Sequence, residues 1–154
     1  MHLYVVALTV LALDQATKLI VRQHLRPGQN IPIIPDLFDL TYVLNPGAAF
    51  GILAGSSPSY RNPFFIAVSL LAILLIVYYH HRHGEERTFP IFGLGLILGG
   101  ASGNLLDRLR FGMVVDFLDL HIGRYHWPAF NVADAAITIG VGLMLLDMLK
   151  ERQH

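Results

Sequence analysis

Hydrophobic residues are gathered into four long runs, separated by segments rich in polar residues and prolines. The runs cover about residues 3–21, 63–79, 89–106 and 130–149. Because the hydrocarbon core of a bilayer takes about 20 helical residues, each run predicts a transmembrane helix. The first run contains Asp14, Gln15 and Lys18 and has no small-residue cleavage site after it, so we interpret it as a retained span rather than a signal peptide. Four spans place both termini on the same side of the membrane.

The two longer connections, 22–62 and 107–129, are patterned rather than featureless. The first contains "DLFDLTYVLN" and the second "GMVVDFLDLHIGRYHW", both rich in aromatic and β-branched residues, which favour strands. We expect these segments to form a small sheet on one face of the helix bundle. The sequence therefore predicts one integral-membrane domain over residues 1–154, all-α apart from this sheet.

The composition supports this class. Hydrophobic residues make up 54% of the chain and charged residues 14%, against about 25% charged in soluble domains. The net charge of zero leaves no basic face for nucleic acid, and the absence of cysteine excludes disulfides and thiolate chemistry. Basic residues flank the spans on both sides, so the charge pattern does not decide the orientation.

Polar residues inside membrane spans are candidates for function. Asp14 and Lys18 lie four residues apart on one helix face, which fits either a functional pair or a buried ion pair that serves packing. Asn104 and Arg108 have the same spacing in the third run. The glycines before them fit close helix packing, but packing does not explain the polar residues.

Two other sites are weaker candidates. The segment "HHRHGEER" at 80–87 could suggest a metal site at His80 and His83, but a solvated loop explains it better because no carboxylate has suitable ligand spacing. The string "GASG" at 100–103 resembles a serine-nucleophile motif. A serine nucleophile needs a nearby base, and His121 and His126 both lie in the connection rather than in a span.

The fourth run raises a sharper question, because Asp134 lies about one turn inside its start. Asn131 could cap this helix, with Asp134 stabilising its first turn. However, Asp116 lies among apolar residues after the third run, at the membrane face where the fourth begins. Two carboxylates in a partly dry site do not ionise together cheaply. Such a pair is the apparatus of an aspartic protease.

At these residues the chain resembles the bacterial lipoprotein signal peptidases, also called type II signal peptidases. The resemblance covers nearly the whole chain and rests on five motifs in order: "DQATK" at 14–18, "NPGAAFG" at 45–51, "GGASGNLLDR" at 99–108, "VVDF" at 114–117 and "FNVADAAI" at 130–137. It implies an aspartyl endopeptidase of the inner membrane with four transmembrane helices, cytoplasmic termini and a periplasmic sheet that cradles the substrate. The site would lie near the periplasmic face.

The resemblance also assigns roles to residues. Asp116 and Asp134 would be the catalytic pair. The residues expected to support the site or bind substrate are Asp14, Lys18, Asn45, Gly100, Asn104, Arg108, Val114, Asn131 and Ala133. The implied partners are membrane lipids and prolipoproteins carrying a diacylglyceryl group on the lipobox cysteine, before which the enzyme cuts. It would act as a monomer, with no metal or cofactor.

Two other functions fit parts of the pattern. A proton-coupled transporter could use Asp14, Asp116 and Asp134 as relay carboxylates, and would be expected to spread them in depth across the bundle. A non-enzymatic membrane scaffold could use its polar residues only to hold helices together. It would leave the pairing of Asp116 with Asp134 unexplained.

Overall fold

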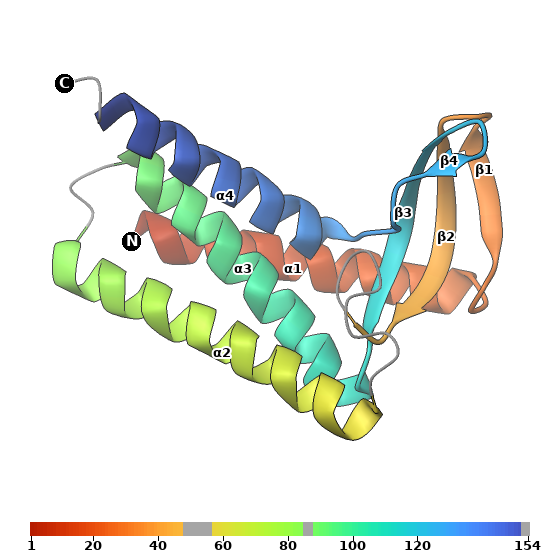
Figure 1. The fold of residues 1–154 in the computed structure, drawn as a ribbon, viewed down its shortest axis with the longest axis horizontal. Helices are drawn as coiled ribbons and strands as arrows, with labels where there is room; N and C mark the ends of the chain where they lie inside the picture. The colour runs from red at the N-terminus through yellow and green to blue at the C-terminus, as the bar shows by residue number, and fades with distance from the viewer. Residues whose placement is uncertain (48–56, 85–87, 152–154) are drawn as a thin grey trace.

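The computed structural model of the chain describes residues 1–47, 57–84 and 88–151. In these ranges the chain forms four helices and four strands (Figure 1). In chain order they are α1 (His2–His24), β1 (Asn30–Ile34), β2 (Phe38–Asn45), α2 (Pro58–His83), α3 (Thr88–Phe111), β3 (Val114–Ile122), β4 (Tyr125–His126) and α4 (Val132–Glu151). The prediction of a mostly helical protein with a small sheet from the long connections is confirmed.

Three helices in the described ranges are long and apolar enough to cross a membrane: His2–His24, Ser59–His83 and Val132–Lys150. The third predicted run, which becomes α3, is not among these three. Instead, α3 is the central helix and packs against α1, α2 and α4 (Figure 1). Its Leu94 and Leu98 are buried in a core cluster that includes Leu3 of α1 and Ile76 of α2.

Glycines allow α3 to approach two neighbouring helices closely. A Cβ atom at Gly99 would lie 2.5 Å from the carbonyl oxygen of Ala7 in α1. A Cβ atom at Gly100 would overlap the carbonyl oxygen of Ala133 in α4. The expectation that these glycines serve close helix packing is therefore confirmed.

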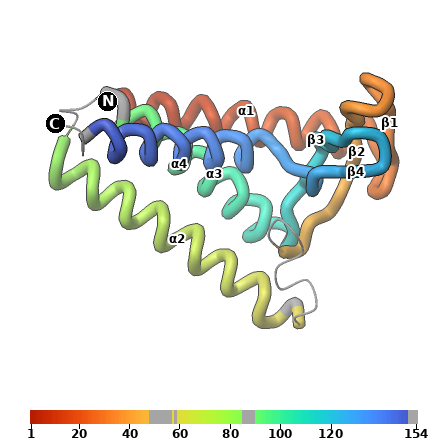
Figure 2. Tube along the Cα trace, turned by 45° about the horizontal axis from the view of Figure 1, so that its top comes forward, coloured from red at the N-terminus to blue at the C-terminus, as the bar shows by residue number. Residues whose placement is uncertain are grey.

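The strands form one antiparallel sheet in the order β1-β2-β3-β4. The sheet lies at one end of the bundle rather than along its side, because Val21 and Leu25 at the end of α1 pack into a core cluster with Tyr42, Val115 and Phe117 of the sheet (Figure 1). The start of α1 and the end of α4 lie at the opposite end of the bundle, and α2 diverges from α1 and α4 toward the sheet (Figure 2).

Candidate active site

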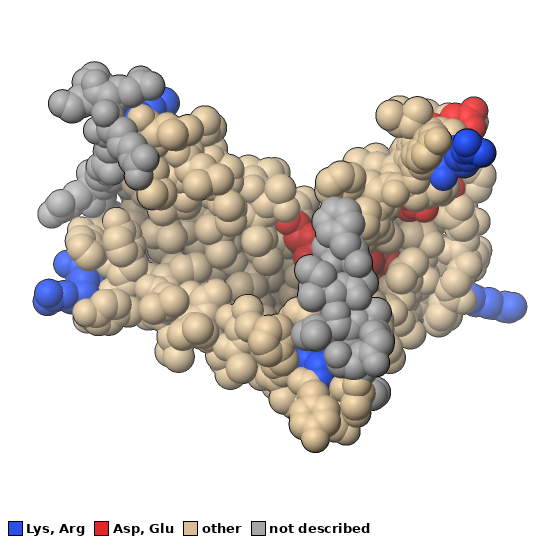
Figure 3. Space-filling model, viewed as in Figure 1, with Lys and Arg blue, Asp and Glu red and all other residues tan. Residues whose placement is uncertain are grey.

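A cavity of about 770 Å³ lies between α2, α3, α4 and the sheet. Figure 3 shows a hollow between the helices and the sheet, with acidic side chains visible in it. Asp116 and Asp134 both line the cavity, so two carboxylates that are 18 residues apart in the sequence share one space. The other predicted site residues that line it are Asn45, Asn104, Arg108 and Val114.

Asp116 is the third residue of β3 and is only 1% exposed. Its carboxylate accepts two amide hydrogen bonds, from Asn45 Nδ2 at 2.8 Å and from Asn131 Nδ2 at 2.7 Å. Burial, reinforced by the negative charge of Asp134, raises the pKa of Asp116 to about 7, although the two amides and the charge of Lys18 oppose the shift. Asp116 can therefore hold or release a proton near neutral pH.

Asp134 lies in the first turn of α4 and takes part in a reciprocal cap. The Asn131 Oδ1 atom accepts the backbone N–H of Asp134 at 2.9 Å, and Asp134 Oδ2 accepts the backbone N–H of Asn131 at 3.3 Å. The capping interpretation is therefore correct but incomplete. The other oxygen, Oδ1, accepts a hydrogen bond from Asn104 Nδ2 at 2.8 Å, and the side chain still borders the cavity.

Two asparagine amides connect the carboxylates. Asn131 Nδ2 donates to Asp116 and also lies 3.3 Å from Asn104 Oδ1, while Asn104 Nδ2 donates to Asp134. Asn131 is fully buried and is not among the residues that line the cavity, so it holds Asp116 from behind rather than facing a substrate. This chain of amides fixes the orientation of both carboxylates with respect to one another.

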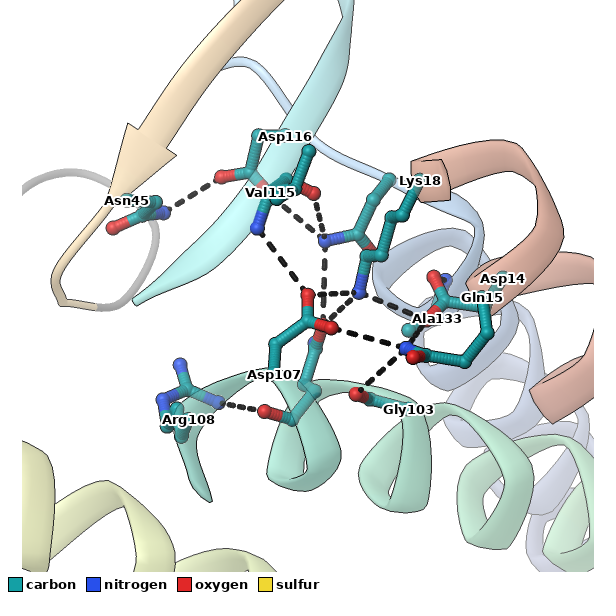
Figure 4. Close-up of polar contacts among 12 residues, drawn as sticks. Asp14, Gln15, Lys18, Asn45, Gly103, Asp107, Arg108, Val115, Asp116 and Ala133 are labelled. Atoms are coloured by element: carbon teal, nitrogen blue, oxygen red, sulfur yellow. Dashed lines mark hydrogen bonds and ion pairs between the residues drawn. The ribbon is translucent and has the colours of Figure 1, made fainter. Parts of the chain in front are cut away.

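A second polar layer lies beneath the amides (Figure 4). Lys18 Nζ contacts Asp14 Oδ2 at 2.8 Å and Asp107 Oδ2 at 2.9 Å, and donates to Asn104 Oδ1 at 3.0 Å. Asp14 Oδ1 in turn accepts the backbone N–H of Ala133 at 2.9 Å. The predicted pair of Asp14 and Lys18 is therefore an ion pair that ties α1 to α3 and α4, and Lys18 contacts the same Asn104 that donates to Asp134.

Sequence reasoning did not select two members of this layer, Asp107 and Gln15. Asp107 also accepts the backbone N–H of Val115 at 3.3 Å, which connects α3 to β3. Gln15 Nε2 donates to Asp107 Oδ1 at 3.0 Å (Figure 4). Asp107 lies three residues after Asn104, on the same helix face, and this spacing was a signal that could have identified it.

The remaining predicted residues lie at the edges of the site. Gly100 and Ala133 form the contact between α3 and α4, and Ala133 is fully buried. Arg108 Nη2 donates to the carbonyl oxygen of Gly47 at 3.1 Å, and Asn45 Oδ1 accepts the backbone N–H of the same residue at 2.9 Å. Arg108 and Asn45 thus hold the last described residue before 48–56. Residues 48–51 of the "NPGAAFG" motif lie outside the described residues.

The alternative sites predicted from the sequence lie elsewhere. The hydroxyl of Ser102 donates to the carbonyl oxygen of Leu98 in its own helix at 2.7 Å, so it is used within α3. The helix α2 continues through the histidine-rich segment as far as His83, further than the sequence predicted, and Gly84 follows with a φ angle of 67°. Residues 85–87 of that segment lie outside the described residues.

The sequence is similar to known proteins over most of its length. The sequence model of the family described as Signal peptidase (SPase) II matches residues 6–150. A lipoprotein signal peptidase from Syntrophus aciditrophicus is 48% identical over 145 residues, covering 94% of this chain and 90% of that protein. A lipoprotein signal peptidase from Desulforapulum autotrophicum is 52% identical over 140 residues, covering 91% of this chain and 86% of that protein.

Solved structures show the same fold. A bacterial membrane enzyme determined by the in meso method at 2.3 Å resolution has a TM-score of 0.86 and 34% sequence identity, and the match covers 96% of this chain and 87% of that chain. A second, at 1.9 Å resolution, has a TM-score of 0.84 and 32% identity, covering 95% and 91%. The family match over most of the length confirms the resemblance noted in the sequence motifs: the chain belongs to the signal peptidase II family.

Proposed function

We propose that this chain is an aspartyl endopeptidase that removes signal peptides from prolipoproteins, cutting before the diacylglyceryl-modified cysteine of the lipobox. One observation carries the proposal: Asp116 and Asp134, from different elements, border one cavity and are linked by the amides of Asn131 and Asn104. The names of the relatives supply the substrate class. One chain contributes both carboxylates, so a monomer suffices.

In this mechanism the pair of carboxylates shares one proton. The ionised member takes a proton from a water molecule, whose oxygen attacks the scissile carbonyl carbon. The protonated member donates to the carbonyl oxygen of the tetrahedral intermediate. When the C–N bond breaks, the leaving amine takes the proton that the first carboxylate received from water. A hydroxyl of the intermediate returns a proton to the second carboxylate as the carboxyl product forms. A pKa near 7 for Asp116 suits this exchange, because the proton can be held or released at neutral pH.

The walls of the cavity suit a membrane-embedded substrate. Apolar side chains from three helices line it, including Val68 of α2, Ile97 of α3, and Ile137 and Ile139 of α4. Val68 is 47% exposed and Ile139 is 56% exposed, so the cavity reaches the outer surface of the bundle. We infer that the signal-peptide helix and its acyl chains enter sideways from the lipid, with the scissile bond at the sheet end.

This function implies an orientation in the membrane. We propose that α3 spans the bilayer as the fourth transmembrane helix, shielded from lipid by the other three. The sheet and the carboxylates then lie near the periplasmic face of the inner membrane, and both termini lie in the cytoplasm. Reporter fusions near Gly84 should therefore report a cytoplasmic location and fusions within 28–36 a periplasmic one, and the reverse result would contradict this orientation.

The arrangement of carboxylates argues against a proton relay. Asp14, Asp116 and Asp134 are not spread in depth, because Asp14 binds the backbone of Ala133, the residue next to Asp134. A scaffold whose polar residues only join helices would not need an open cavity bordered by two carboxylates. The peptidase accounts for both features.

The direct test is to incubate the detergent-purified protein with a diacylglyceryl-modified prolipoprotein and to follow release of the signal peptide on gels. Asp116→Asn and Asp134→Asn should each lower the rate about a thousandfold, since asparagine keeps the shape of the side chain but cannot act as the base. Asp36→Asn, at an exposed turn of the sheet, is the matched control and should retain activity. Near-normal turnover by either cavity variant would exclude the aspartyl mechanism.

The substrate assignment needs its own comparison. The same prolipoprotein without its diacylglyceryl group should be cleaved far more slowly, because the acyl chains hold the cysteine beside the apolar walls of the cavity. Equal cleavage of the two substrates would leave the peptidase in place but refute the requirement for lipid.

A further inference from the structure

A second group of ligating side chains lies on the sheet, apart from the cavity carboxylates. Asp119 and His121 of β3 are two residues apart and so share one face of the strand. His126 of β4 is the cross-strand partner of His121. Each of the three residues offers one potential ligand atom, and these atoms lie within 4.8 Å of one another. The hairpin turn, with Gly123 at a φ angle of 55°, brings His126 into this group.

His121 has an unusual environment for a buried imidazole. The residue is 8% exposed, and among the described residues its Nδ1 atom has no hydrogen-bond partner. That atom lies 4.0 Å from Asp119 Oδ1, on the side where the three potential ligand atoms meet. Buried ring nitrogens are normally hydrogen-bonded, so an unpaired nitrogen directed at a carboxylate indicates a position for a ligand.

The opposite nitrogen of the same ring faces another carboxylate. His121 Nε2 lies 4.0 Å from Asp39 Oδ1, and the other oxygen of Asp39 accepts a hydrogen bond from Asn30. Metal-binding histidines usually donate their second ring N–H to a carboxylate, which fixes the ring and the tautomer. Asp39 is thus placed to give a metal-bound His121 this support once the 4.0 Å separation closes to a hydrogen bond.

The charge balance also favours a cation. Asp39 and Asp119 are direct partners in the register of β2 and β3, and like charges placed opposite each other destabilise a sheet. Their side-chain partners among the described residues include His121, His126 and Asn30, of which only the histidines can carry positive charge. A divalent cation between Asp119 and His121 would offset this repulsion.

We propose that Asp119, His121 and His126 bind one zinc-type divalent cation that clips β4 to β3. Two imidazoles and one carboxylate suit Zn²⁺, with water in the fourth position, whereas Mg²⁺ and Ca²⁺ prefer all-oxygen sites. In a tetrahedral site with metal–ligand distances of about 2.0–2.1 Å, ligand atoms lie roughly 3.3 Å apart. The contact of His126 Nδ1 with Asp119 Oδ1 is already 2.9 Å, whereas His121 Nδ1 lies 4.0 Å from Asp119 Oδ1, so the side chain of Asp119 must move toward His121.

The imidazole of His126 must turn as well. The imidazoles of His121 and His126 are stacked with ring centroids 4.5 Å apart and planes 17° from parallel, so their in-plane lone pairs do not meet at one point. The side chain of His126 is 48% exposed and can turn out of the stack, whereas the buried His121 stays in place. The site is thus half preformed, and metal binding completes it.

The position of this site links it to the wall of the cavity. The backbone N–H of Trp127, next to His126, donates to the carbonyl oxygen of Leu120 at 2.8 Å, and both residues line the cavity. A metal that holds β4 against β3 would therefore stiffen the sheet side of the cavity. Its role is structural, since hydrolysis by Asp116 and Asp134 does not involve it.

The test uses tag-free protein in detergent, dialysed against EDTA and then against chelator-free buffer. Calorimetric titration with ZnCl₂ should show one equivalent bound, and Co²⁺ should give the d–d absorption of a tetrahedral site with nitrogen ligands. His126→Ala should weaken Zn²⁺ binding at least about tenfold. His83→Ala, which removes an exposed histidine from the separate cluster at the end of α2, is the matched control and should bind as the wild type does.

The contrary results are distinct. Absence of saturable Zn²⁺ binding up to about 100 μM, or unchanged binding by His126→Ala, would overturn the proposal. Loss of binding in His83→Ala but not in His126→Ala would move the metal to the α2 histidines and would overturn it equally. Thermal unfolding of the wild type provides a second measurement that needs no variant. Zn²⁺ should raise the midpoint, and an unchanged midpoint would count against a clip between β3 and β4.

Discussion

At alkaline pH, the Asp116→Asn variant should be more stable than the wild type, although it has lost its activity. In the folded protein Asp116 keeps its proton up to about pH 7, whereas in the unfolded chain it loses the proton near the ordinary aspartate pKa of 3.8. Between these values the folded state binds more protons than the unfolded state. The free energy of unfolding of the wild type therefore falls as pH rises through this window and stays low above it. Asparagine has no proton to lose, so the variant avoids this fall.

The magnitude follows from the shift. A rise from 3.8 to about 7 is roughly three pH units, and at about 1.4 kcal/mol for each unit the wild type loses about 4 kcal/mol of stability between acidic and alkaline pH. The substitution has a cost of its own, because Asn45 and Asn131 both donate to Asp116 and asparagine has only one acceptor oxygen. One unmatched amide costs about 1–3 kcal/mol. That cost does not depend on pH. The change with pH in the stability difference between the variant and the wild type therefore comes from the carboxylate alone.

The single tryptophan, Trp127, lies on the cavity wall and reports unfolding by fluorescence. Thermal midpoints of both proteins would be measured in detergent at about pH 5 and pH 8, so that about two of the three units of the window lie between them. A chain of this length shifts by about 2–4 °C per kcal/mol, so the midpoint difference should change by roughly 5–10 °C in favour of the variant. Asp36→Asn, which removes an exposed charge from the same sheet, should show no such change. A midpoint difference for Asp116→Asn that is the same at both pH values would refute the burial of an easily protonated carboxylate.

Further predictions concern the layers around the site. Lys18→Met should destabilise the protein by about 3–5 kcal/mol, because it leaves the buried carboxylates of Asp14 and Asp107 without their cation; a loss below about 1 kcal/mol in the same fluorescence assay would contradict this ion-pair network. Gly100→Ala should cost about 1–3 kcal/mol because its methyl group would overlap the backbone of α4. Gly142→Ala, where an added Cβ meets nothing within 4 Å, is its control, and equal thermal midpoints for the two variants would show that α3 and α4 are not so closely packed.

Much of the architecture was predictable because it is encoded locally. Helices follow from runs of apolar residues near the length of a bilayer, and strands from β-branched and aromatic segments between them. All four predicted runs became helices, each extending somewhat beyond its run except at the start of α4, where Asn131 caps the helix. The motif residues also pointed to the pair of carboxylates. The central position of α3 between the other three helices was not predictable from its own run, because it depends on how the helices pack together.

What the sequence determined by itself was the set of elements and the residue types that carry the chemistry, since both depend on neighbours within a few positions. Only the tertiary structure decided how side chains from different elements meet. The register of β2 on β3, shifted between Leu40 and Val43, places Asn45 beside the strand that carries Asp116. Packing between elements likewise decides two other contacts. They are the ion pair of Lys18 with Asp107 and the contact of Asp119 with His126 across the hairpin. Such contacts arise because the chain must bury apolar surface and satisfy its buried polar groups together, and no local pattern in the sequence records the result.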